Sequence, residues 1–140
     1  IYAKYDHQIE AAHELGAGEL SGKYDRVIDC VGNDQTLSLS TKTAKPGSWI
    51  VILGIPMQGI NLPGLRVIMN EIKIFPSIMY SSTDGVKDFT IAAKVLSRYP
   101  EIGKKIITHR FRLDEAEEAF AVAGDKNSKS IKVVFDPSLT

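Results

Sequence analysis

Two glycines, each at the end of a short apolar run, are the residues of this sequence whose type and spacing best fit a binding site. Gly32 follows the run over residues 26–31, and Gly54 ends the run over residues 49–54. A glycine at the carboxyl end of a parallel strand has no Cβ, so the backbone there can approach a ligand closely. Ligands of open α/β sheets bind at that edge. The spacing therefore predicts a cofactor site where these two strands end.

The other reactive side chains show no spacing typical of catalysis or of metal binding. The three histidines form no zinc-ligand motif with one another or with Cys30, the only cysteine. They are His7, His13 and His109. Cys30 falls in a strand expected to be buried, which favours an inert thiol. Asp29 is expected to be buried as well, so it needs hydrogen-bond partners or a place near the cofactor.

The elements that would position the two glycines indicate a parallel α/β sheet. Between the apolar runs lies a segment of helix length, with Asn33 or Asp34 as its N-cap and a stop at residues 45–47. Two strands joined by such a crossover are parallel. Further strands are predicted at residues 1–4, 72–79, 106–111 and 131–135, and further helices at residues 7–15, 65–70, 82–98 and 113–123. Pro76 places its strand at an edge or a bulge.

Length and composition limit the classes of partner. The chain has 140 residues, enough for one domain with a real core. Its 17 basic and 17 acidic residues cancel, so bulk charge predicts neither a nucleic-acid nor a membrane partner. The longest strongly apolar run, residues 49–56, is too short to span a bilayer. A single cysteine fits a reducing cytoplasm. The abrupt start at Ile1 predicts the carboxyl-terminal part of something longer.

Five segments, in a fixed order, carry a family resemblance. They are QIEAAHELGA, YDRVIDCVG, KPGSWIVILGIP, NEIKIFPSIMY, and ITHRFRLDEAEEAF followed by IKVVFDP. In this order they resemble the carboxyl-terminal half of the medium-chain dehydrogenase/reductase family, the zinc-type alcohol dehydrogenases and quinone oxidoreductases. The resemblance implies an α/β fold, an incomplete Rossmann-like doubly wound parallel sheet in three α/β/α layers. Residues 1–100 would be a partial cofactor-binding domain without its first strand and Gly-rich loop, and residues 101–140 the closing segment that returns to the catalytic domain.

The resemblance also implies a nicotinamide dinucleotide cofactor and residues that bind it. NAD-binding members place an acidic residue where the second strand meets the adenosine ribose. This chain has Ala3 there, followed by Lys4 and Tyr5, which predicts NADP(H): Lys4 would pair with the 2′-phosphate, and Tyr5 would lie near the adenine. From the residues alone, an ordinary strand end with side chains in solvent fits as well. The other implied cofactor residues are Cys30, Val31 and Gly32 on the adenosine and ribose side, Leu53, Gly54, Ile55, Ile78 and Met79 near the nicotinamide, and Lys132 near the pyrophosphate.

Three functions stay open from the sequence. The first is the cofactor-binding portion of an NADP(H)-dependent oxidoreductase that moves hydride to or from an alcohol, aldehyde or enone. This chain would then hold no catalytic residue and no zinc ligand, zinc would belong to the intact enzyme, and the isolated chain would be inactive. The second is a fragment of a Rossmann-like, adenosylmethionine-dependent methyltransferase. The third is a non-catalytic dimerising module. A homodimer is expected through residues 72–78, because the family's sixth strand commonly pairs across a two-fold axis.

Overall fold

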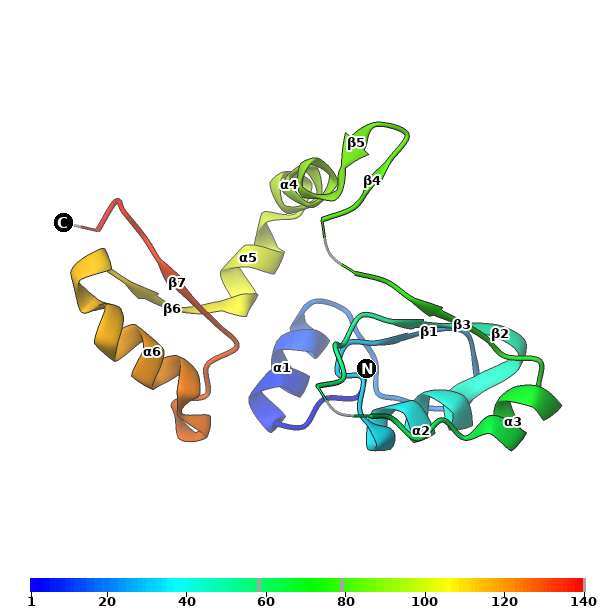
Figure 1. Cartoon of the computed structure of the whole chain (residues 1–140). Helices are drawn as coiled ribbons and strands as arrows, with labels where there is room; N and C mark the ends of the chain where they lie inside the picture. Colours follow the sequence, from blue (N-terminus) through cyan, green and yellow to red (C-terminus); the bar gives the residue numbers. More distant parts are fainter. Residues whose placement is uncertain (58, 79, 140) are drawn as a thin grey trace. The chain divides into compact units, whose positions relative to one another are not determined.

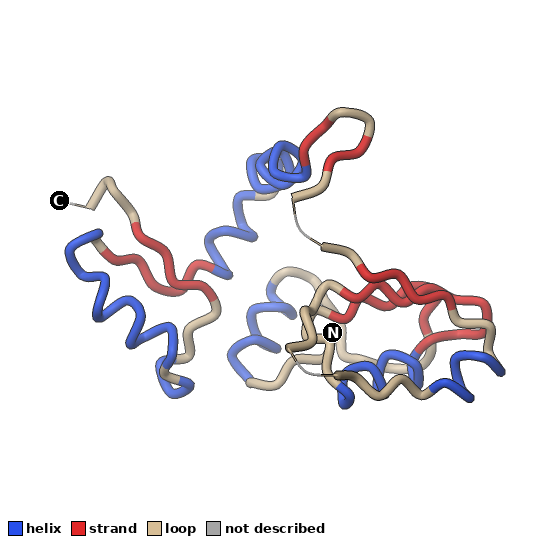
Figure 2. Tube along the Cα trace, in the orientation of Figure 1, coloured by secondary structure: helices blue, strands red, loops and turns tan. Residues whose placement is uncertain are grey.

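The computed structural model describes residues 1–57, 59–78 and 80–139. It divides into two compact units. The sheet unit comprises residues 21–88, and the terminal unit comprises residues 1–20 and 89–140. The predicted domain division after residue 100 follows the family's domains and stays a prediction. Figure 2 marks the helices, strands and loops of both units.

The sheet unit is a three-stranded parallel sheet. Its strands lie in the order β1 (Tyr24–Asp29), β2 (Ala44–Ile52) and β3 (Lys73–Pro76). The crossover helices are α2 (Asp34–Thr43) and α3 (Gly64–Met69), and both lie on the same face of the sheet (Figure 1). Right-handed crossovers that add each new strand in the same direction place their helices on one face. The parallel, incomplete Rossmann-like sheet is therefore confirmed, and this unit holds two of the three predicted layers.

The core lies between the sheet and its two helices. Ala44, Ile50 and Ile72 are its buried residues, and Ile50 is 0 % exposed. Residues of opposite parity point to the other face, where Trp49 and Phe75 stack with ring centroids 4.3 Å apart. The prediction that β1 is buried on both faces is wrong, because Ile28 is 64 % exposed. No described helix of the sheet unit covers that face.

Helix α2 begins as predicted. Asn33 is its N-cap: the Asn33 side chain accepts from the Thr36 backbone N–H, and the Thr36 hydroxyl accepts from the Asn33 N–H. This reciprocal pair satisfies two backbone donors that a helix start leaves free. The helix is rich in serine and threonine, so packing must support it. Leu37 and Thr41 supply that packing, since both are buried against the sheet unit.

The strand boundaries differ from the prediction at both ends. β1 ends at Asp29, two residues before the predicted end. The Asp29 side chain accepts hydrogen bonds from the backbone N–H groups of Val31 and Gly32, so these groups do not pair with a neighbouring strand. Cys30 therefore lies after the strand and is exposed, so the predicted buried thiol is wrong. β2 begins at Ala44 and not at residue 49. Its register with β1 slips around Gly47, whose φ is +72°.

The position of β3 is as predicted, but the segment after it is a hairpin where a helix start was predicted. β3 is an edge strand that contains Pro76, as the proline predicts. The predicted helix start at residues 82 or 83 is wrong, because β4 (Ser82–Thr83) and β5 (Val86–Lys87) form an antiparallel hairpin. Asp84 and Gly85 both have positive φ, 51° and 76°, as a tight type I′ hairpin turn requires.

The described residues of the terminal unit form four α-helices and one strand pair. They are α1 (Asp6–Glu14), α4 (Asp88–Arg98, whose first residue belongs to the sheet unit), α5 (Pro100–Ile106), β6 (Ile107–Phe111), α6 (Ala116–Gly124) and β7 (Lys132–Phe135), with 3-10 turns at Leu113–Glu115 and Lys126–Ser128. β6 and β7 are parallel and α6 packs on them, with Ala119 buried (Figure 1). This is a second, smaller strand–helix–strand unit.

Three predictions fail in the terminal unit. Residues 1–4 are not a strand, because a parallel strand needs a partner and none of the described residues pairs with them. The predicted core face of α4 is exposed, and α4 has no buried residue. The residues of that face are Phe89, Ala92, Ala93 and Leu96. Pro100 does stop α4, but it also opens α5, a helix that the prediction lacks. Proline suits the first helical position because its missing N–H has no partner there anyway.

Membrane insertion through a helix finds no support in the part of the chain that the structure describes. None of its helices is long and apolar enough to cross a bilayer.

Candidate functional site

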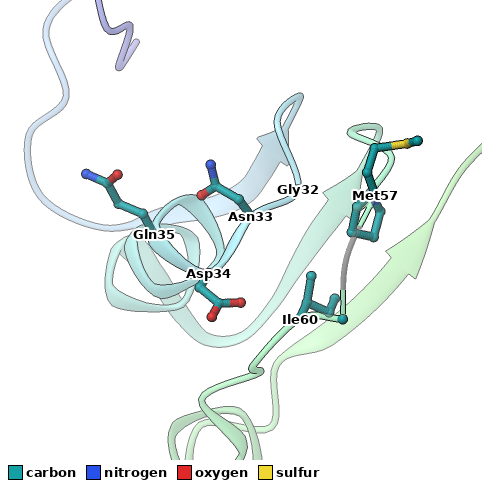
Figure 3. Close-up of a pocket in the computed structure, with 8 residues that line it drawn as sticks. Gly32, Asn33, Asp34, Gln35, Met57 and Ile60 are labelled. Carbon is teal, nitrogen blue, oxygen red and sulfur yellow. The ribbon is translucent and has the colours of Figure 1, made fainter.

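A cavity of about 410 Å³ opens where β1 and β2 end (Figure 3). One wall is the turn from β1 into α2, and the other is the loop that follows β2. Its lining residues are Gly32, Asn33, Asp34, Gln35, Pro56, Met57, Gly59 and Ile60. The size falls within the range of roughly 300–1,000 Å³ that ligand pockets occupy. The sheet edge that the two glycines predicted is therefore hollowed.

Asp29 organises the backbone behind this cavity. The side-chain Oδ1 of Asp29 accepts from the N–H groups of Val31 and Gly32, each at 2.9 Å. The backbone carbonyl of Asp29 accepts from the N–H groups of Leu53 and Gly54, at 2.8 and 3.2 Å. One residue thus ties together the two segments that follow β1 and β2. Asp29 itself is 4 % exposed.

The two strand-end glycines lie directly against each other. A Cβ on Gly54 would stand 2.1 Å from the Val31 carbonyl carbon, and a Cβ on Gly32 would stand 2.6 Å from the Gly54 oxygen. Gly32 also has a φ of +71°, which other residues rarely adopt. This contact by itself explains why both positions are glycine. Close approach of the backbone to a ligand stays a prediction.

The loop after β2 is fastened to the start of α2. The Asp34 carboxylate accepts from the side-chain and backbone N–H groups of Asn61, at 2.7 and 2.8 Å. These two residues are 27 positions apart in sequence. The latch holds the wall that carries Met57 and Ile60 beside the helix start, and Figure 3 shows Asp34 pointing toward Ile60.

We expect the latch to depend on pH in acid. The hydrogen bonds from the Asn61 side chain, and then from its backbone, hold the pKa of the Asp34 carboxyl below its ordinary value of 3.8. A lowered pKa in the folded state means that the latch is fully formed above pH 3.8 and is lost as the pH falls through the lower folded pKa. The protection factor of the Asn61 amide against hydrogen exchange, followed from pH 5 downward, should fall only at the acid end. The same fall in Asp34→Asn would contradict this, because residue 34 cannot titrate in that variant.

The structure brings some of the predicted cofactor residues together. Val31, Gly32, Leu53 and Gly54 meet through the contacts of Asp29 and the glycines. Cys30 and Ile55 flank this junction and are exposed. Ile78 is also exposed and follows the edge strand, where the Ser77 N–H donates to the Ile52 carbonyl. Met79 lies outside the described residues.

The remaining predicted residues belong to the terminal unit. Lys4 is exposed with its Nζ 5.5 Å from the centroid of the Tyr5 ring, and that ring stacks on His7 at 5.7 Å. Ala3 is half-buried, and Lys132 is an exposed residue of β7. A small hollow of about 120 Å³ lies between Tyr5, His7 and Gln8 on one side and the stretch from Ala123 to Ser130, including Lys126, on the other.

The sequence patterns do not predict the side chains that shape the larger cavity. They indicate Asp34 only as a possible helix cap and give no role to Asn61. No local pattern links residues so far apart. The proline- and glycine-containing loop after β2 was a usable signal, because loops at the carboxyl end of a parallel sheet line its ligand sites.

The charge around the larger cavity is negative. Asp34 is the one ionised side chain among the lining residues that the structure describes, and Asp29 lies immediately behind Gly32. Hence this hollow is poorly suited to a phosphate and better suited to a neutral or cationic group with hydroxyls. Among the described residues, no three histidine, cysteine or acidic side chains gather as metal ligands.

A family model described as zinc-binding dehydrogenase matches residues 4–98, which include the whole sheet unit and its cavity. The chain belongs to the zinc-binding dehydrogenase family. An L-arabinitol 4-dehydrogenase from Aureobasidium melanogenum is 27 % identical over 117 residues, which are 82 % of this chain and 30 % of that protein. The chain thus spans about a third of the length of the curated relatives it matches.

Solved structures agree with this family. A short chain alcohol dehydrogenase from E. coli CFT073, complexed with NADH, superposes with a TM-score of 0.74 at 21 % identity, over 94 % of this chain and 42 % of that one. A putative zinc-binding dehydrogenase from Sinorhizobium meliloti 1021, bound to NADP, gives 0.63 at 25 % identity, over 84 % and 33 %. The similarity to the E. coli structure shows the fold alone. The Sinorhizobium meliloti protein is a putative member of the same zinc-binding dehydrogenase family as this chain.

Proposed function

We propose that this chain is the cofactor-binding portion of a nicotinamide-dependent oxidoreductase. The observation that carries the proposal is the cavity at the carboxyl ends of β1 and β2, in a chain whose family is zinc-binding dehydrogenase. Open parallel sheets bind dinucleotides at this edge. Relatives and structural neighbours that act on alcohols, or that are bound to NADH or NADP, support the same assignment.

The nicotinamide–ribose half of the cofactor fits the larger cavity. Its amide and carboxylate side chains, Asn33 and Asp34, suit ribose hydroxyls, while Met57 and Ile60 form an apolar wall for a ring. Leu53, Gly54 and Ile55 would hold the nicotinamide side, and Cys30, Val31 and Gly32 the adenosine and ribose side. When bound, the nicotinamide supplies the hydride chemistry, and the chain binds and orients it.

NADP(H) is the cofactor we propose. Ala3 leaves no carboxylate to repel a 2′-phosphate, and the exposed Lys4 forms no ion pair with an acidic side chain among the described residues. Lys126, across the small hollow from Tyr5, adds a second positive charge in the terminal unit. Lys132 would attract the pyrophosphate as a point charge.

Zinc does not fit the described residues, among which no three histidine, cysteine or acidic side chains form a ligand cluster. We propose that a zinc ion, where the intact enzyme has one, is bound outside this chain, and that the chain alone does not oxidise alcohols. Alcohol or polyol oxidation by this chain on addition of Zn²⁺ would contradict the proposal. The relatives support an alcohol or polyol, with its carbonyl product, as the substrate class, and an enone stays a prediction from the sequence.

A homodimer through residues 72–78 is a further part of the proposal. β3 lies at the sheet edge with one side unpaired among the described strands, which favours pairing with another copy. Light scattering after size exclusion would show a monomer if this is wrong. The single cysteine supports a cytoplasmic location, which cell fractionation would test.

Calorimetric titration tests the function directly. The protein should bind NADPH, bind NADH more weakly, and leave adenosylmethionine unbound. Binding of adenosylmethionine alone would favour the methyltransferase alternative. Binding of none of the three would leave only the non-catalytic module and overturn the proposed function.

A further inference from the structure

The two oxygens of the buried Asp29 carboxylate differ in their hydrogen bonding. Its Oδ1 accepts from Val31 and Gly32, but its Oδ2 is buried and has no hydrogen-bond partner among the described residues. Burying a polar oxygen without a partner costs free energy. An asparagine could accept the same two N–H groups through its own Oδ1. The cap alone therefore does not explain why the residue carries a charge.

The position of the charge suggests what it acts on. Gly32 lines the larger cavity, and the Gly32 N–H is 2.9 Å from Asp29 Oδ1, so the carboxylate lies directly behind the cavity wall. No lysine or arginine is among the described lining residues to neutralise it. Charges act more strongly across a buried, weakly polar region than through water. The charged side chains in or directly behind the described cavity wall, Asp34 and Asp29, are thus negative, and they oppose the partial positive charge of the α2 N-terminus.

We propose that Asp29 is a positioning residue whose negative charge makes the cavity favour the oxidised cofactor over the reduced one. This inference rests on the proposed function, which places the nicotinamide half in this cavity. The oxidised nicotinamide ring carries a positive charge, and the dihydronicotinamide ring is neutral. The Asp29 carboxylate attracts the positively charged oxidised ring and interacts only weakly with the neutral reduced ring. Asp29 holds the two strand-end segments in place and also biases the bound cofactor toward its oxidised state.

The test is the ratio of the dissociation constants for NADP⁺ and NADPH, measured by calorimetry on the wild-type protein and on Asp29→Asn. Asparagine keeps the acceptor for Val31 and Gly32 and removes the charge. We expect the ratio of oxidised to reduced Kd to rise about fivefold, a modest change for one charge acting across a protein wall. Loss of a purely structural cap would weaken both forms equally and leave the ratio unchanged.

Asp25→Asn is the matched control. Asp25 lies near the start of the same strand, is exposed, and pairs with Lys45 at 2.8 Å. Four residues of strand separate it from Asp29, about 13 Å, which exceeds the screening length of roughly 8 Å in physiological salt. Its ratio should equal that of the wild type. A fivefold shift in this control would show a general effect of charge and would overturn the role of Asp29.

A second variant keeps the inference testable if Asp29→Asn does not fold, which circular dichroism would reveal. Asp29→Glu retains the charge and should retain the wild-type ratio within about twofold, even where both affinities fall. A ratio in Asp29→Asn equal to that of the wild type, or a fivefold shift in Asp29→Glu, overturns the inference while leaving cofactor binding intact. Failure of the wild type to bind either form instead overturns the proposed function.

Discussion

Gly54→Ala is expected to lower the free energy of unfolding by about 3 kcal/mol, the upper part of the range for overpacked sites. The new Cβ would lie 2.1 Å from the Val31 carbonyl carbon and 2.5 Å from the Gly32 nitrogen. These are backbone atoms, which cannot rotate away as a flexible side chain can. The strand-end segments would have to separate, and the hydrogen bonds to the Asp29 carbonyl would lengthen or break. Urea unfolding of the variant and the wild type measures the difference.

Gly64→Ala is the matched control in the same unit. A Cβ on Gly64 would meet nothing within 4 Å, and the residue is the first of α3. Alanine is the better helix former, so stability should stay the same or rise by up to about 1 kcal/mol. If Gly54→Ala were as stable as this control, the two strand-end segments would not be packed as closely as described.

Lys4→Ala is expected to weaken NADPH binding about tenfold, because one charge-assisted hydrogen bond to a phosphate is worth about 1.4 kcal/mol or more. NADH has no 2′-phosphate, so its affinity should change less than about twofold. Lys4 is exposed and lies over the Tyr5 ring, so the substitution removes no buried contact and should leave folding unaffected. Calorimetry with both cofactors measures the two effects in one preparation.

The control for Lys4 is another exposed lysine of the terminal unit. Lys94 lies on α4, and Lys94→Ala changes the net charge of the protein by the same amount. It should alter neither affinity. Equal weakening of NADPH and NADH in Lys4→Ala would remove the 2′-phosphate role and return Lys4 to an ordinary solvated side chain.

The sequence predicted the β1–α2–β2 unit well because its signals are local. Asn33 is a strong helix cap, the apolar runs have strand length, and Gly32 and Gly54 mark the strand ends. The hairpin at residues 82–87 had an equally local signal, the Asp84-Gly85 dipeptide typical of tight hairpin turns. The apolar spacing after it favours a helix that already begins at residue 82 or 83, and the hairpin replaces the first part of that helix.

Burial was harder to predict from the sequence. Ile28 and Phe89 are large apolar residues in the predicted elements, yet both are exposed, because burial depends on which element covers a face and not on the residue alone. The Asp34–Asn61 latch could not be predicted either, because it joins the first residue of α2 to a loop residue 27 positions away, and no local pattern links the two. Local pattern predicted the strand ends beside the cavity, and tertiary contacts decide which side chains line it.

Amide hydrogen exchange of the protein with and without saturating NADPH tests the central claim most directly. The cofactor should slow exchange at the backbone N–H groups of residues 32–35, 57, 59 and 60, which line the larger cavity. The hairpin at residues 82–87 should exchange as before. Protection confined to the hairpin or to α4, with these cavity residues unchanged, would contradict a cofactor bound at the ends of β1 and β2.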